Sequence, residues 1–153
     1  MILIAGFAVD FLLGWWIAPG APRISLLAST GWLASASLAV GALALLLGCW
    51  LGHASHGALK RNVSPDGDAA SVLTGGPYGR VRHPFYLSLI LIILSLVLLL
   101  RSYPFLAGLA AMAAVSLNEA KKEEARMMKS FGAEYLEYRR RTGMFLPRIH
   151  RSI

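Results

Sequence analysis

The sequence predicts an all-α membrane protein, a bundle of about four transmembrane helices with a cytoplasmic loop and a C-terminal amphipathic helix. Hydrophobic residues make up 56% of the 153 residues and charged residues only 15%. The mean hydropathy of +0.58 is too high for an ordinary soluble domain of this length. The apolar residues gather in four stretches, and the basic residues lie almost entirely at one end of them. Since one bundle would use the whole chain, we predict a single domain over residues 1–153.

The four apolar stretches give the predicted spans, which are residues 2–17, 26–51, 85–100 and 105–117. A spanning helix needs about 20 residues, fewer if its ends extend into water, so the fourth stretch is short. Only Arg101–Pro104 separates the third and fourth spans, and we therefore expect a tight antiparallel hairpin. The first stretch has no positively charged segment before it and no small-residue cleavage site. We expect it to be retained, not removed as a signal peptide.

The basic residues predict the orientation of the bundle. Four of them lie in the loop before the third span and nine follow residue 117, whereas the two opposite turns hold only Arg23 and Arg101. Because cytoplasmic loops retain positive charge, both termini are predicted to be cytoplasmic. The formal charge of +7 flanks the spans instead of forming a free basic domain, which favours anionic lipids over nucleic acid as the partner. A chain without sorting signals fits a bacterial-type inner membrane.

Residues 118–153 are predicted to form a cytoplasmic cap. Met128, Phe131, Tyr135 and Tyr138 recur at spacings of three, four and three, which is typical of an amphipathic helix. The basic residues around this stripe suit a helix that lies on an anionic surface or folds over the loop. Gly132 is expected to divide or bend the helix. Taken alone, the stripe indicates an interfacial helix without chemistry.

Several motifs follow one another in a fixed order through most of the chain. They are Leu59–Pro65, Leu73–Tyr78, Arg82–Tyr86, the Glu123–Glu124 pair, Phe131–Gly132, Tyr135, Tyr138 and Phe145–Pro147. Over roughly residues 40 to 149 this order resembles the isoprenylcysteine carboxyl methyltransferase and phospholipid methyltransferase superfamily. Those enzymes are integral membrane proteins that use S-adenosylmethionine. Their Arg-His-Pro-x-Tyr-x-Gly pattern has Ser88 at its last position here, a small residue that still permits close helix packing.

The resemblance implies transfer of a methyl group to a lipophilic acceptor, with carboxyl O-methylation of an isoprenylcysteine-like substrate ahead of phospholipid amine N-methylation. Arg139, Arg140 and Arg141 are candidates for holding an acceptor carboxylate, with Arg140 as our choice, although three consecutive arginines are also typical of lipid anchors. Glu119 or a nearby tyrosine is the candidate for deprotonating an acceptor amine, with Glu119 as our choice. The cofactor-binding residues that the resemblance implies are Gly76, Pro77, Tyr78, Arg82, His83, Pro84, Tyr86, Glu123 and Glu124.

The chemistry of the donor agrees with those residues. Pro84 suits the first turn of a helix, so amide groups around His83 to Tyr86 would be free to bind the donor carboxylate. Glu123 and Glu124 could accept hydrogen bonds from ribose hydroxyls or the ammonium group. No G-x-G-x-x-G sequence occurs, so a Rossmann cofactor site is not supported.

Two other classes of function stay open at this point. Some membrane reductases resemble these enzymes in their C-terminal half and would require a nicotinamide site for NADPH. The bundle could also be a non-catalytic membrane scaffold. In that case Glu119 with Lys122, and Glu123 with Arg126, would be plain surface ion pairs worth about 0.2 to 0.5 kcal/mol each.

Four residues within or near the spans need separate interpretation. His53 and His56 have no further ligand to complete a metal site, so no metal is predicted and both are interpreted as interfacial. Asp10 is a functional candidate because a carboxylate is costly in lipid. Cys49 is expected to pack within the second span.

Overall fold

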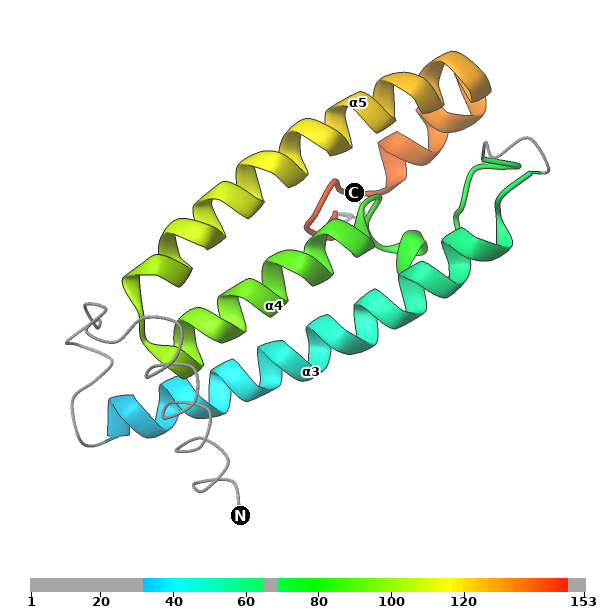
Figure 1. Ribbon diagram of the computed structural model, residues 1–153. Helices are drawn as coiled ribbons and strands as arrows, with labels where there is room; N and C mark the ends of the chain where they lie inside the picture. The colour runs from blue at the N-terminus through cyan, green and yellow to red at the C-terminus, as the bar shows by residue number, and fades with distance from the viewer. Residues whose placement is uncertain (1–31, 65–68, 149–153) are drawn as a thin grey trace, which may run out of the picture. The chain divides into compact units, whose positions relative to one another are not determined.

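The computed structural model describes residues 32–64 and 69–148, and this part of the chain is helical without a β-strand (Figure 1). Its elements are α3 (Trp32–Arg61), the 3-10 helix η1 (Gly76–Gly79), α4 (Pro84–Leu100) and α5 (Tyr103–Arg141). The all-α class is therefore confirmed for the described residues. The predicted first span, with Asp10, and the turn at Arg23 lie outside them.

The second and third predicted spans correspond to α3 and α4. The helix α3 continues past the predicted end at residue 51 to Arg61. Within the described ranges it is the one helix that is long and apolar enough to cross a membrane, whereas α4 is apolar but has 17 residues. The bundle of four spans stays a prediction.

The fourth predicted span continues into the cap without a break as far as Gly132. Helix α5 does not end at residue 117 but runs to Arg141, with non-helical dihedral angles at Gly132 (φ 49°, ψ −117°). Beyond Gly132 the helix turns back on itself, as the orange end of α5 shows in Figure 1. The prediction that Gly132 bends the helix is confirmed.

The chain divides into two compact units. Among the described residues, one comprises 32–47 and Ile90–Ala113, and the other comprises 48–64, 69–89 and 114–148. In the first unit, α3 and α4 approach closely at Gly41, where an added Cβ would lie 3.0 Å from the Leu99 side chain. Glycine is therefore the residue that permits this contact.

The second unit has polar small residues in its helices and an aromatic core in its cap. Ser55, Ser88 and Ser116 are almost completely buried, which lets the helix backbones come close together. In the cap, Tyr135 and Tyr138 bury their side chains against Val72 of the loop, with the partly buried Met127, Met128 and Phe131 around them. The predicted helix stripe thus folds over the loop.

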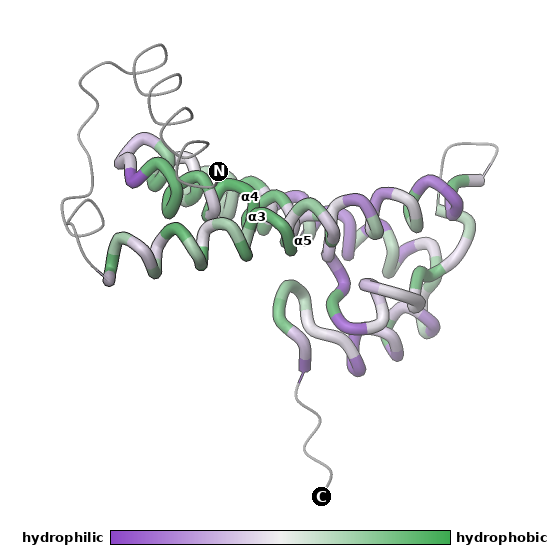
Figure 2. The backbone as a smooth tube through the Cα atoms, turned by 90° about the horizontal axis from the view of Figure 1, so that it is seen from below, coloured by the Kyte–Doolittle hydropathy of each residue, from purple (hydrophilic) through white to green (hydrophobic). Residues whose placement is uncertain are grey.

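The polarity of the elements changes along the chain. Figure 2 shows apolar residues along α4 and mostly polar residues in the later part of α5. Several large apolar side chains of α3 are exposed, among them Val40, Leu43, Leu46 and Trp50, as expected where lipid is the solvent. Cys49 is also exposed, so the expectation that it packs inside the protein is wrong. The buried α3 positions 37, 41, 44, 48 and 55 recur at helical spacing, and residue 49 falls between them.

Candidate functional site

The backbone of the site is held by the C-terminal segment. The amide of Arg82 donates to the carbonyl oxygen of Gly143 (2.8 Å), and the amide of His83 donates to that of Met144 (3.1 Å). Gly143 has no room for a Cβ, which would meet the carbonyl oxygen of Leu146. Pro84 then starts α4, as predicted. The prediction that the His83 amide is free to bind an anion is wrong, because this amide donates to the carbonyl oxygen of Met144. Pro84 adds no donor, since proline has no backbone N–H.

Arg82 lies at the centre of a buried charge cluster. Its Nε donates to Glu124 Oε1 at 2.8 Å, and both side chains are only 7% exposed. Its Nη1 donates to the carbonyl oxygens of Arg139 (3.2 Å) and Thr142. Most of the donor capacity of this guanidinium is therefore spent on the protein itself.

His83 lies between two carboxylates. Its Nε2 is 3.3 Å from Glu124 Oε1, and its Nδ1 is 3.6 Å from Glu123 Oε2. A neutral imidazole can donate to one of these groups, and an imidazolium can donate to both. The rings of Tyr86 and Phe145 lie 5.8 Å and 6.0 Å from the imidazole ring. His83 is thus fixed by charge and by aromatic packing at once.

The two carboxylates differ in their surroundings. Glu124 is buried, whereas the Glu123 side chain is 35% exposed. The pKa of Glu123 lies below its usual value, chiefly because His83 can donate a hydrogen bond to it. Burial opposes this shift in the pKa of Glu123, and a hydrogen bond from Tyr86 and the charge of Arg126 assist it. Glu123 is therefore an accessible anion at neutral pH.

Two small cavities border this cluster. Each has a volume of about 60 Å³, and both are lined by Leu59, Tyr78, Arg82, His83 and Glu123. Pockets for small molecules are typically about 300 to 1,000 Å³. A ligand larger than a few water molecules thus requires surrounding side chains to move.

Tyr138 joins the cap to the motif loop. Its hydroxyl donates to the carbonyl oxygen of Tyr78 at 2.7 Å. Burial raises the pKa of Tyr138 to about 12, so the hydroxyl stays protonated and keeps this bond at neutral pH. The bond ties the cap helix to η1, which carries Gly76 and Pro77.

The structure brings together most of the predicted site residues. Those around the two small cavities or the charge cluster are Tyr78, Arg82, His83, Tyr86, Glu123 and Glu124. Pro84 follows His83 directly as the first residue of α4. Gly76 and Pro77 instead line a larger pocket in the same unit.

The two residues predicted to serve the acceptor lie elsewhere. Glu119 forms a surface ion pair with Lys122 (2.7 Å). The Arg140 side chain is 71% exposed and lies 4.0 Å from Glu137. Arg139 joins the cluster instead, with its Nε 3.3 Å from Glu124 Oε2.

Among the three consecutive arginines, the structure places Arg139, not Arg140, against Glu124. The helical spacing could have indicated this, because Arg139 follows Tyr135 by four residues and therefore shares its helix face. Thr142, which follows Tyr138 by four residues, was missed in the same way. It is buried and bonds Arg82 through its carbonyl.

His53 and His56 take no part in the cluster. The His56 ring lies 6.4 Å from that of Phe85. Across residues 32–64 and 69–148, no group of three or more His, Cys, Asp or Glu side chains is placed to hold a metal ion.

Comparison with known proteins gives the family. Residues 36–134 match the family model described as phospholipid methyltransferase. The chain belongs to this family. The superfamily resemblance inferred from the motifs is thereby confirmed.

A curated relative matches part of the same region. The chain is 37% identical over 79 residues to the cobalt-zinc-cadmium resistance protein CzcN of Cupriavidus metallidurans. The match covers 52% of this chain and 37% of CzcN. The chain thus matches little more than a third of the length of that relative.

Proposed function

We propose that the protein transfers a methyl group from S-adenosylmethionine to a lipophilic acceptor, with the donor bound at His83 and Glu123. One observation carries the proposal. Motif residues that are about 40 positions apart in sequence converge on an imidazole that contacts two carboxylates beside enclosed space. S-adenosylmethionine carries an ammonium and a sulfonium, and an accessible carboxylate in a partly buried site favours both.

We assign the donor contacts to fewer residues than the family resemblance implies. Arg82 and Glu124 are buried and bonded to each other, so we assign them the role of holding His83 in place, although Arg82 also lines the cavity. His83, Tyr86 and Glu123 border the cavity and would bind the donor. Methyl transfer is an in-line displacement, in which the protein aligns the two reactants and excludes water.

For the acceptor, the charges of the site favour an amine over a carboxylate. An acceptor carboxylate would need a free guanidinium, yet Arg82 is committed to protein groups and Arg140 is exposed. A phospholipid amine is therefore our first candidate. Carboxyl O-methylation of an isoprenylcysteine-like substrate is second, supported by Arg139, whose side chain is 49% exposed and could turn toward an acceptor.

Calorimetric titration of the detergent-purified protein with S-adenosylhomocysteine tests the donor site. We expect saturable binding that His83→Ala and Glu123→Gln weaken at least about tenfold, the loss expected for one hydrogen bond to a charged group. Glu134→Gln, an exposed change on the same helix, should leave binding unchanged. No binding to folded wild type would overturn the proposal and favour the reductase or scaffold alternatives, which titration with NADPH would then separate.

A second assay separates the acceptors. Transfer of a labelled methyl group is followed with phosphatidylethanolamine and with an S-farnesylcysteine analogue as competing acceptors. Methylation of the amine lipid supports the first candidate, and methylation of the carboxylate alone would replace it with the second.

A further inference from the structure

A third pocket lies beside the end of α3, apart from the charge cluster. Its volume is about 450 Å³, which falls within the range typical of small-molecule sites. It is lined by Ala54, Ala58 and Arg61 of α3, by Leu73 and Gly75 of the loop, and by Gly76 of η1. All of these residues belong to the second unit.

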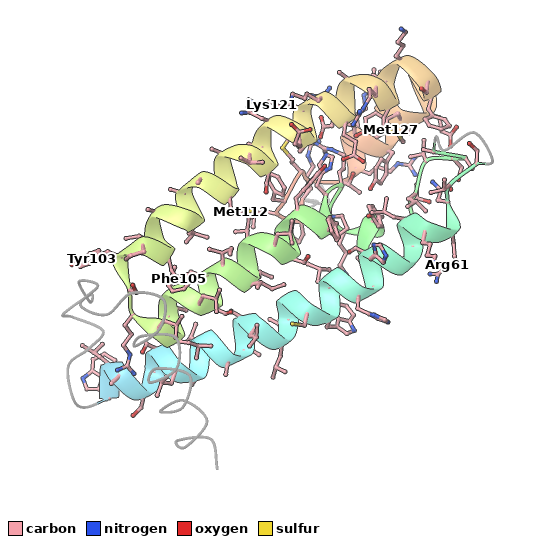
Figure 3. All side chains as sticks on the ribbon, viewed as in Figure 1. Arg61, Tyr103, Phe105, Met112, Lys121 and Met127 are labelled. Atoms are coloured by element: carbon pink, nitrogen blue, oxygen red, sulfur yellow. The ribbon has the colours of Figure 1, made fainter. Side chains whose placement is uncertain are left out.

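Arg61 provides the charge of this pocket. It is the last residue of α3 (Figure 3), and its guanidinium forms no ion pair within the described parts of the chain. A guanidinium with free donors pairs readily with phosphate oxygens. Ala54, Ala58 and Leu73 add apolar surface beside it. One cation against an apolar wall suits an amphiphile whose polar end is anionic.

Gly75 leaves open space at the wall of this pocket. Its dihedral angles (φ −94°, ψ 162°) are open to any residue, and an added Cβ would meet nothing within 4 Å. Neither the backbone conformation nor internal packing therefore requires glycine there. The missing side chain leaves space and uncovered backbone at the pocket wall, where a ligand can approach closely.

The pocket also adjoins the proposed reaction site. Asn62 and Leu73 line both this pocket and one of the small cavities, and that cavity is lined by His83 and Glu123 as well. A headgroup bound at Arg61 would therefore hold its outer substituent next to the donor residues.

We propose that this pocket binds the phosphate of the acceptor lipid, with Arg61 pairing with the phosphodiester and Gly75 leaving room for the headgroup. The inference rests on the proposed function, because it takes the acceptor to be a membrane phospholipid. The apolar side of the pocket then contacts the glycerol end of the lipid. Such a site selects the acceptor by its phosphate before its amine is presented for methylation.

The test is calorimetric titration of the full-length protein in detergent with dihexanoylphosphatidylethanolamine, a soluble short-chain lipid. Arg61→Gln and Gly75→Leu should each weaken lipid binding at least about tenfold, as expected for loss of a hydrogen bond to a charged group or of the space for the headgroup. Both variants should bind S-adenosylhomocysteine as the wild type does. Lys60→Gln is the matched control, because it removes the same charge one residue away from the pocket lining.

Each outcome decides the proposal. An equal loss in Lys60→Gln would overturn it, because the effect would then be that of surface charge. Inorganic phosphate that binds as tightly as the lipid would also overturn it, since the pocket would then recognise free phosphate. Wild type that binds S-adenosylhomocysteine but not the lipid would overturn this inference alone, whereas failure to bind S-adenosylhomocysteine would overturn the proposed function.

Discussion

At the residue scale, Arg82 is the one arginine of the described residues that is buried, and its guanidinium is bonded to protein groups. Removing one partner of a buried ion pair leaves the other charge uncompensated and costs about 3 to 5 kcal/mol. We expect Arg82→Gln and Glu124→Gln to lower the free energy of unfolding by that amount, measured by denaturant titration in detergent. Arg141→Gln breaks an exposed pair with Glu137 and should cost less than about 1 kcal/mol. A stable Arg82→Gln variant that loses only donor binding would make Arg82 a ligand contact instead of a support.

Glu123 should make the free energy of unfolding depend on pH in the acidic range. Its pKa is lowered in the folded state, so its carboxylate stabilises the fold above the unfolded pKa of about 4.5. That contribution is lost as the pH falls through the lower, folded pKa. Glu123→Gln should therefore flatten the plot of unfolding free energy against pH below about pH 4.5. The exposed Glu134→Gln should keep the wild-type slope, and an unchanged slope in Glu123→Gln would contradict the shift.

The sequence predicted which motifs meet but not every atom that joins them. The grouping of His83, Glu123 and Glu124 in one site could be predicted from the order of the motifs. The choice between Arg139 and Arg140 could not follow from it, because adjacent helical residues point about 100° apart and the bend at Gly132 resets the direction of the helix. Likewise, the use of the His83 amide depends on a contact with Met144 from the far end of the chain. Such long-range bonds leave no local pattern.

At the scale of the element, α5 shows that a fall in hydropathy along the sequence does not mark the end of a helix. Hydropathy reports the surroundings of a residue, and the helix passes from apolar to polar sequence near residue 117 without a break. The break comes at Gly132, where the backbone adopts a conformation that residues with a Cβ rarely reach.

Gly132→Ala should therefore disturb the cap, although its Cβ would meet no atom within 4 Å. Backbone strain of this kind costs about 1 to 3 kcal/mol, and relief by straightening α5 would separate Tyr135 and Tyr138 from Val72. We expect lower thermal stability and faster trypsin cleavage at Arg139–Arg141. Gly108→Ala is the control in the same helix, where alanine also has space and should stabilise by about 0.5 to 1 kcal/mol. Equal effects of both changes would show that the bend does not hold the cap.

At the scale of the whole molecule, the distribution of charge predicts the orientation in the membrane. Basic residues crowd the loop before α4 and the chain after residue 117, whereas the turn between α4 and α5 has Arg101 alone. Arg101 is itself engaged with the carbonyl oxygen of Ala34 (3.2 Å). If the positive-inside rule holds, the cap and the donor site face the cytoplasm, where S-adenosylmethionine is made available, and the α4–α5 turn faces the opposite side.

Labelling of single cysteines measures this orientation. In a Cys49→Ser background, one cysteine is placed at Ser130 in the cap and another at Tyr103, which is 46% exposed at the start of α5. A membrane-impermeant maleimide added to intact cells should label Tyr103→Cys at once and Ser130→Cys only after permeabilisation. Labelling of both from the same side would contradict the predicted crossing of α5. Labelling of Ser130→Cys alone in intact cells would reverse the orientation, placing the Glu123 site away from its donor and removing the basis for the proposed activity in the cell.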